Sequence, residues 1–411
     1  MRLKFWLDTL GGTVFIFFII GFMLNLFDRL DFLDPIGDAL DDMELTDIVF
    51  SRIREHPGAD TNIVVVNVGN LSRDGIAEQI NILNSYNPKV IALDFFLRQP
   101  KNAYGDSVLA EALSHVENLV MVGRLDYYNE ETKSFDTLET SHPMFTKYGV
   151  TGFANLITDA ENQNRFKTCR SFTPKEYFGI PQKPISAFAV RIAEIYDPQA
   201  TKAFLDRGKP YELINFRGNI LGSEGEFANV FPSLDVEDVF RRNFTPEMIR
   251  DKIVLLGYTG AYLGDTSWED KFYTPLNLNY AGKTNPDMFG VVIHANILSM
   301  ILQRNYLNQM GTGTSIFLGI LLCFLNVVWF SKIYMALPKW YDGLTKAIQV
   351  AEAFLLLALI IVVFYFFNYQ LNLTLAIVAI LLAGDSLEFY YGVVKNLFSK
   401  EDRKELFKRR E

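Results

Sequence analysis

Residues 62–68 read NIVVVNV, and this stretch decides the fold of the large middle part of the chain. The β-branched run 63–68 is typical of a buried strand. A helix is expected from Ser72, which can serve as its N-cap, to about Ser85, and the apolar run 90–93 is a second strand. Strand, helix and strand at this spacing are typical of a right-handed crossover unit, so the two strands are predicted to be parallel.

The alternation of strands and helices continues along the chain. A helix is predicted at 106–113 and a strand at 119–122, followed later by helices at 185–195 and 291–303 and a strand at 253–256. The predicted fold class is therefore an α/β domain whose sheet is mostly parallel and carries helices on its faces. A helix at 45–55, strands at 149–154 and 212–216, and long loops at 163–179 and 261–287 complete this prediction.

Four strongly apolar segments flank this domain, one before it and three after it. They cover residues 10–27, 315–337, 347–367 and 373–394, and each is about long enough to cross a bilayer core as a helix. A cleaved signal peptide is the alternative for the first segment, because Arg2 and Lys4 precede it. Residues 23–27 offer no small-x-small cleavage site, so an uncleaved anchor is favoured.

Basic residues near the ends of these segments indicate the orientation, because Lys and Arg mark the cytoplasmic side. Lys339 and Lys346 lie between the second and third segments, and the tail is strongly basic. Both termini are therefore predicted in the cytoplasm. The organisation expected is a cytoplasmic N-terminus and first membrane helix at 1–27, an extracytoplasmic domain at 28–314, three membrane helices at 315–394 and a cytoplasmic tail at 395–411.

The formal net charge of the chain is −9 although its tail is basic, so the acidity belongs to the outer domain. This balance argues against nucleic-acid binding, which needs a basic surface. The two cysteines lie in different parts of the predicted topology, Cys169 in the outer domain and Cys323 in a membrane helix. They cannot approach each other closely enough for a disulfide.

Polar residues follow the predicted strands at the points where the strands end. Asn67 and Asn70 follow the first strand, Asp94 the second and Arg124 the third, and Thr259 lies in the turn after 253–256. Ligands of open α/β sheets bind beyond the carboxyl ends of the strands, so these residues are candidate ligand-binding groups. Capping of loops is the other common role of such residues.

His294 lies on the predicted helix 291–303 and could act as a base, a metal ligand or a pH switch. A structural histidine that bonds to a strand end is the alternative. A zinc pair is not indicated, because no second histidine lies three or four residues away and no cysteine is near. Asp94, Asp106 and Asp270 could bind a hard cation such as calcium if the fold brings them together.

The motifs of nucleophilic catalysis and of phosphate binding are both missing from the sequence. The chain contains neither a Gly-x-Ser-x-Gly elbow nor a Gly-x-x-x-x-Gly-Lys-Ser/Thr loop. We therefore predict a protein that is not an enzyme and that uses no cofactor or metal.

Ionisable residues occur within the predicted membrane helices. Asp385 and Glu388 are three residues apart and share one helix face, and such groups usually face protein or water. We predict an interface with a partner membrane protein there, with a hydrogen bond to the second membrane segment or a proton site as alternatives. Ala383 and Gly384 are small enough for close helix approach. Glu352 lies nearer the cytoplasmic end and is expected to snorkel.

Five pieces of the outer part resemble, in order, the second CHASE family of bacterial extracellular sensory domains. They are the strand 62–68, the segment 90–96 with Pro100 and 106–110, the Asn-Phe-Arg-Gly stretch 215–218, the strand and turn 251–260, and Asp270 with Thr274, Pro275 and 290–296. The resemblance implies a periplasmic sensory domain on a bacterial inner-membrane protein. It adds Asp270, Thr274, His294 and Asn296 to the candidate ligand-binding residues.

Two features depart from the family pattern. The first strand of the family usually ends in carboxylates, whereas this chain has Asn67, Gly69 and Asn70, which removes charge from the expected cleft. Family members also commonly carry an output domain after their last membrane helix, and here residues 395–411 follow.

These observations predict a sensory or regulatory subunit embedded in the lipid bilayer. Its outer domain would bind a small molecule or an envelope component, and its helices would pass the event to another membrane protein or to a second copy of the chain. The coupling element would be the helix at 291–303, separated from 315 chiefly by residues 311–313. A structural scaffold of an envelope-spanning assembly and a periplasmic hydrolase are the alternatives.

Overall fold

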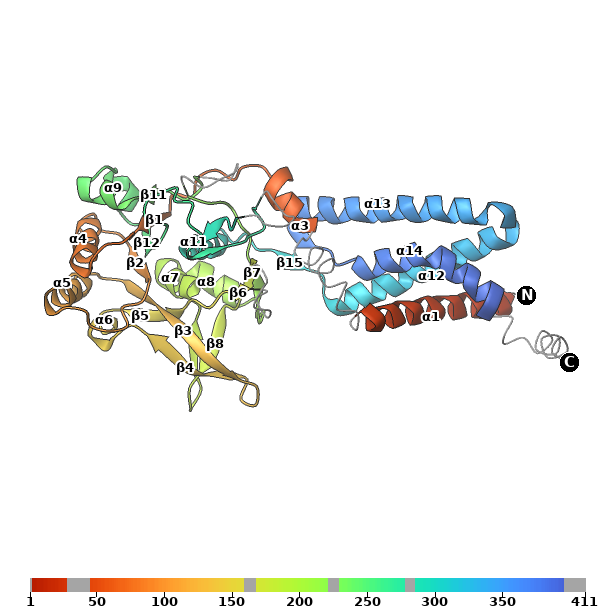
Figure 1. Cartoon of the computed structure of the whole chain (residues 1–411), viewed down its shortest axis with the longest axis horizontal. Coiled ribbons are helices and arrows are strands. Elements are labelled where there is room, and N and C mark those ends of the chain that lie inside the picture. Colours follow the sequence, from red (N-terminus) through yellow and green to blue (C-terminus); the bar gives the residue numbers. More distant parts are fainter. Residues whose placement is uncertain (1, 28–44, 159–167, 221–228, 278–284, 395–411) are drawn as a thin grey trace. The chain divides into compact units, whose positions relative to one another are not determined.

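The chain folds into two compact units in the computed structural model, which describes residues 2–27, 45–158, 168–220, 229–277 and 285–394 (Figure 1). The helical unit comprises Met1–Val49 and Asn308–Glu411, and the α/β unit comprises Phe50–Leu307. The predicted basic tail at 395–411 and the start of the predicted outer domain at 28–44 lie outside the described residues.

A mixed sheet forms the centre of the α/β unit. Its parallel part has the order β11-β1-β12-β2-β3, with β5 also pairing with β3. The late strand β12 therefore lies between the first two strands. The predicted mostly parallel sheet is confirmed for these strands, which are β1 (Ile63–Asn67), β2 (Val90–Asp94), β3 (Leu119–Asn129), β5 (Val150–Phe153), β11 (Ser233–Leu234) and β12 (Ile253–Gly257).

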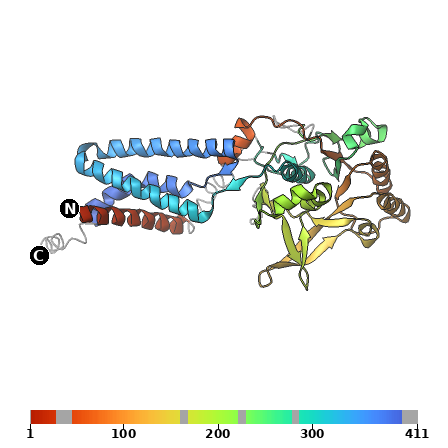
Figure 2. The ribbon, with the colours of Figure 1, turned by 180° about the vertical axis from the view of Figure 1, so that it is seen from behind.

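An antiparallel extension continues the sheet beyond β3. This strand runs to Asn129 and pairs antiparallel with β4 (Ser134–Thr140), and β8 (Lys175–Phe178) and β9 (Lys183–Ser186) form a second hairpin beside it. Both hairpins project from the body of the unit in Figures 1 and 2. The prediction of a strand at 119–122 was too short, and the loop predicted at 163–179 is wrong where β7 (Cys169–Phe172) and β8 occupy it.

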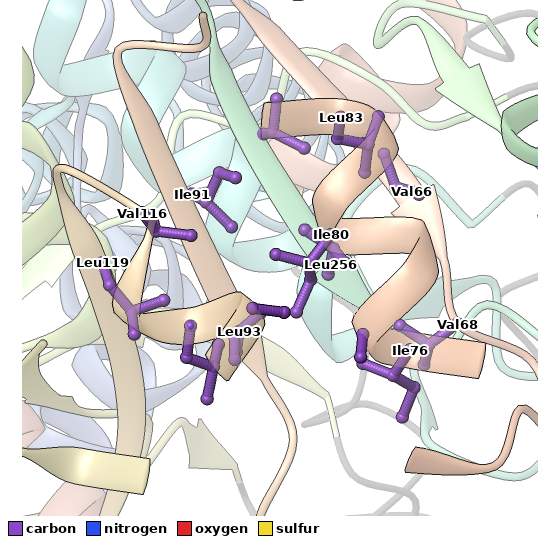
Figure 3. Close-up of a cluster of buried hydrophobic side chains, with 14 of the residues drawn as sticks. Val66, Val68, Ile76, Ile80, Leu83, Ile91, Leu93, Val116, Leu119 and Leu256 are labelled. Carbon is purple, nitrogen blue, oxygen red and sulfur yellow. The ribbon is translucent and has the colours of Figure 1, made fainter. Parts of the chain in front are cut away.

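One face of the sheet packs against α4 (Arg73–Asn84) and α5 (Ala103–Ser114). Figure 3 shows alternate strand residues such as Val66, Leu93 and Leu256 meeting Ile76 and Ile80 of α4. Burial of each such side chain contributes about 1.5–3 kcal/mol. Three short helices add to this layer: α6 (Pro143–Thr146), α9 (Val236–Arg241) and α10 (Pro246–Ile249).

The opposite face carries α7 (Phe188–Tyr196) and α11 (Gly290–Leu302), with α8 (Pro198–Leu205) beside them. A Cβ atom added at Gly257 would lie 2.7 Å from Cβ of Val291, so α11 rests directly on the backbone of β12. The predicted helix 185–195 begins later because residues 185 and 186 belong to β9.

The connection after α11 differs from the prediction. The helix ends at Leu302, Arg304 has a left-handed φ of 53°, and β15 (Asn308–Gln309) precedes the next helix. A left-handed residue stops an α-helix. The expected nearly continuous helix from 291 to 315 is therefore wrong, and a turn and a strand segment separate its two parts.

Among its described residues, the helical unit has four helices that are long and apolar enough to cross a membrane. They are α1 (Arg2–Phe27), α12 (Thr312–Ala336), α13 (Tyr341–Phe367) and α14 (Thr374–Phe389), which continues as a π-helix at Tyr390–Val394. Helix α14 contacts the other three, with Ala379 and Ala383 fully buried at the contacts. Small residues at these positions allow close helix approach.

The remaining described elements are short. They are α3 (Leu45–Ile48), the π-helical turn Val49–Ile53, β6 (Ile157–Thr158), β10 (Glu212–Leu213), β13 (Lys271–Phe272), β14 (Met288–Phe289), the 3₁₀ turn Pro338–Trp340 and β16 (Tyr369–Gln370).

Candidate functional site

Three strands end side by side at the carboxyl edge of the parallel sheet. Asn67 of β1 is paired in register with Gly257 of β12, and Gly257 is paired with Asp94 of β2. Leu93 belongs to the core on the α4 and α5 face, so Asp94 points to the opposite face, where α7 and α11 pack.

Asn67 fastens this edge of the sheet. Its buried amide donates to Asp235 Oδ1 at 3.0 Å and to the Gly260 carbonyl at 3.1 Å, and its oxygen accepts from the N–H groups of Gly69 and Thr259 at 2.9 and 3.0 Å. Every polar group of the side chain is therefore used within the fold. Asn67 shapes the edge, and the neighbouring Asn70 is exposed to solvent.

Asp94 is the half-buried carboxyl at this edge. Within the described ranges it makes no hydrogen bond and no ion pair, although residues on several sides reduce its contact with water. Burial raises the pKa of the Asp94 carboxyl from 3.8 to about 7. A carboxyl in this state can donate or accept a hydrogen bond near neutral pH.

His294 and Thr259 provide two further buried polar atoms without partners in the part of the chain that the structure describes: the ring Nδ1 and the side-chain Oγ1. The imidazole contacts the Phe188 ring at a centroid distance of 5.2 Å, and burial lowers its pKa to about 4. His294 lies one turn after Val291, which rests on Gly257. We refer to Asp94, Thr259 and His294 as the edge site.

Two other predicted ligand residues serve the fold instead. Asn296 accepts from the Arg217 N–H at 2.7 Å and donates to the Gly218 carbonyl at 2.9 Å, so it holds the Asn-Phe-Arg-Gly stretch against α11. Thr274 donates to Asp287 Oδ2 at 2.6 Å, and its N–H bonds to Oδ1 of the same carboxylate at 2.8 Å. These side chains have no free capacity for a ligand in this arrangement.

Two other predicted residues, Arg124 and Asp270, are exposed to solvent. Arg124 is not at a strand end, because β3 continues past it, and its exposed guanidinium pairs with Asp126 at 3.0 Å and Glu139 at 3.7 Å. Asp270 is exposed, and its carbonyl accepts from the Gly290 N–H at the start of α11 at 3.2 Å.

A buried ion pair was not predicted from the sequence. Arg73 of α4 bonds to Asp106 of α5, and both are almost completely buried. This places Asp106 on the α4 and α5 face, away from Asp94, so these two carboxyls do not form the calcium cluster that the sequence left open. The described residues contain no group of three or more His, Cys, Asp or Glu that could hold a metal. A pocket of about 760 Å³ lies beside the pair, with Lys101, Lys147 and Tyr148 in its lining.

Asp385 has a partner in this chain that differs from the expected one. Lys346 Nζ lies 2.6 Å from Asp385 Oδ1, and the two side chains remain 53% and 64% exposed. The lysine is part of α13 and not of a loop, so the contact is with the third apolar segment, and the predicted bond to the second is wrong. Glu388 lies close to Asp342 and Lys346. An interface with another chain stays a prediction.

Comparison with known proteins gives one family. A family model described as the CHASE2 domain matches residues 15–329, which include the whole α/β unit. No curated protein and no solved structure matches the chain. Because the match spans more than half of the chain, this protein belongs to the CHASE2 domain family of extracellular sensory domains.

Proposed function

We propose that this chain is a sensory or regulatory subunit of a bacterial inner membrane whose α/β unit binds a polar ligand or an envelope component at the edge site. The observation that carries the proposal is the Asp94 carboxyl at the carboxyl edge of the sheet, which has no partner among the described residues. Ligands of open α/β sheets bind at this edge. The sensory family favours this role over a periplasmic hydrolase.

Helix α11 is the element that connects the edge site to the membrane helices along the chain. It carries His294 near its start, and near its end Ser299 and Gln303 hold Asp60 at 2.6 and 2.8 Å. Asp60 precedes β1, so α11 is fixed to both ends of the sheet. A ligand that displaces its first turn would move a rigid element, as coupling between sites requires.

Asp385 and Lys346 form the proposed contact with a partner. Both side chains are largely exposed on this chain although they lie on helices of membrane-spanning length. Charged groups in such helices are costly in lipid and usually face protein or water. A second membrane protein, or a second copy of this chain, would cover the pair.

Ligand binding can be tested on the full chain in detergent with Cys323 replaced by serine. Cys169 is fully buried, so its reaction with a fluorogenic maleimide reports unfolding of the α/β unit. We expect a low-mass fraction of envelope extract to raise the unfolding midpoint by about 5–10 °C at saturation. The shift should disappear in Asp94→Asn and persist in Lys147→Ala, which alters the separate pocket. A shift lost only in Lys147→Ala, or no shift with any fraction, contradicts the edge site.

The proposed orientation places both termini in the cytoplasm. A reporter that works only in the cytoplasm is then expected to be active after Glu411 and inactive when inserted at residues 129–132, the turn between β3 and β4. Activity at the turn and none after Glu411 would show the opposite orientation. Activity at both sites would contradict the arrangement with four membrane-spanning helices.

A scaffold function is the second candidate, and one observation favours it. Asn67, Thr274 and Asn296 use their polar groups for bonds within the α/β unit. If the edge residues serve only to stabilise the domain, Asp94→Asn leaves both assembly and output of the complex unchanged. A sensor retains assembly in this variant but loses its response.

A further inference from the structure

The helical unit contains a group of polar side chains between α12 and α13. Asn326 of α12 and Gln349 of α13 are 5% and 2% exposed, and Glu352 lies one turn after Gln349. Such groups are expensive among apolar helices unless each hydrogen-bonding atom has a partner. The positions of their hydrogen atoms therefore show which oxygen atoms still lack a hydrogen-bond donor.

The orientation of the Gln349 amide is fixed by α14. Its nitrogen donates to the carbonyls of Ile380 at 2.8 Å and Leu381 at 2.9 Å. A flipped amide would place its oxygen against two carbonyl oxygens, so the assignment follows from the hydrogen-bond network. Oε1 must then point elsewhere, and within the described ranges it meets no donor.

Asn326 and Glu352 also each have a buried oxygen atom without a hydrogen-bond donor in the described part of the chain. The Asn326 nitrogen donates hydrogen bonds to the Leu322 carbonyl, at 3.2 Å, and to the Glu352 carboxyl. Its Oδ1 has no donor in the described part of the chain. Glu352 Oε2 is also buried without a donor there, so this acid does not snorkel as predicted. The nearby cation Lys346 is bound to Asp385. The Asn326 amide meets the Glu352 carboxyl, and Gln349 lies one turn before Glu352 on α13, so three acceptor oxygens without a donor among the described residues lie along this part of the two helices.

We propose that Glu352 holds a proton inside the helical unit and donates it to one of the two amide oxygens, Asn326 Oδ1 or Gln349 Oε1. One proton turns Oε2 from an acceptor into a donor and satisfies an amide oxygen at the same time. It also removes the negative charge from a buried carboxyl that no cation among the described residues offsets. The site is an exchangeable proton site that joins α12 to α13, and it does not depend on the function proposed for the α/β unit.

The test uses dicyclohexylcarbodiimide, which adds to protonated carboxyl groups in apolar surroundings, on the full chain in detergent. Peptide mass spectrometry is expected to find Glu352 modified, with at least on the order of tenfold more label than Asp385, which is exposed and paired with Lys346. The label should decline as the pH is raised. Equal labelling of the two acids, or no label on Glu352 in a folded sample, overturns the proposal.

Sodium and two variants complete the experiment. If sodium protects Glu352 from labelling and choline at equal ionic strength does not, the carboxyl binds a sodium ion instead of a proton, and the proposal is overturned. Glu352→Gln keeps a neutral donor and is expected to match the thermal stability of the unmodified chain, whereas Glu352→Leu lowers it. A Glu352→Gln variant as unstable as Glu352→Leu contradicts a neutral carboxyl.

Discussion

Replacing Arg73 by methionine is expected to lower the unfolding midpoint of the α/β unit by about 10 °C, because one partner of a buried ion pair is removed. The variant leaves the Asp106 carboxylate in a site that is 2% exposed, with the Lys101 N–H at 2.9 Å as its main donor. It also removes the guanidinium from the face of Phe145, where it lies 5.3 Å from the ring centroid. Cys169 labelling during a thermal ramp measures the loss.

A double variant separates lost charge compensation from lost packing. Arg73→Met with Asp106→Asn is expected to recover most of the stability, since the amide oxygen still accepts from Lys101 and no buried charge remains. Arg124→Met serves as the matched control, because its ion pair is exposed and should contribute little. A double variant as unstable as Arg73→Met alone would assign the effect to packing.

The second large effect is a pair of opposing pH dependences at the edge site. The pKa of Asp94 rises from 3.8 to about 7 on folding, so its contribution to stability is present at low pH and is lost as the pH rises through 7. The pKa of His294 falls from 6.5 to about 4, so its contribution is present above 6.5 and is lost as the pH falls through 4. Between pH 4 and 6.5, stability falls with rising pH because of Asp94 and rises because of His294, so the two pH dependences largely cancel.

Replacing one of the two residues should make the pH dependence of stability that the other causes measurable. Asp94→Asn is expected to raise the unfolding midpoint at alkaline pH by about 5 °C and to become less stable as the pH falls from 6.5 to 4. His294→Gln should instead lose stability as the pH rises from 4 to 7. Thermal ramps across this range measure both.

Two checks apply to this pH dependence. Asp287, whose pKa burial also raises to about 7, is common to all the proteins and cancels in the differences. Asp136→Asn, at an exposed position of β4, is the control and should change neither slope. Parallel pH profiles for all the variants would show that the edge groups titrate alike in the folded and unfolded states.

The central strands could be predicted because their sequence alone demands burial. The run Ile63 to Asn67 and the run Ile253 to Gly257 contain apolar residues on both faces, which only a strand covered on both sides accommodates. The extension of β3 was missed because Arg124, Asp126 and Asn129 interrupt the apolar pattern. There, alternating exposure and hairpin pairing with β4, and not the apolar pattern of the strand itself, determine the structure.

The carboxyl edge of the sheet could be predicted from the sequence, but the polar side chains that lack a partner there could not. Asn67 and Asp94 follow strands in the same way, yet one amide is used by four bonds within the fold and the other side chain has none among the described residues. Asp235 and Gly260, which use the Asn67 amide, lie far along the chain. Arg73 and Asp106 likewise meet only because α4 and α5 pack side by side.

Helix α11 also bears on how the protein is made. Its thirteen residues are apolar on nearly all sides and would span only about 20 Å, less than a bilayer core of about 30 Å. If the α/β unit is exported, as in the proposed orientation, such a segment would resemble a stop-transfer sequence. His294, Asn296 and Ser299 would lower its affinity for lipid, so these polar residues would allow the secretion channel to release this helix while it retains α12.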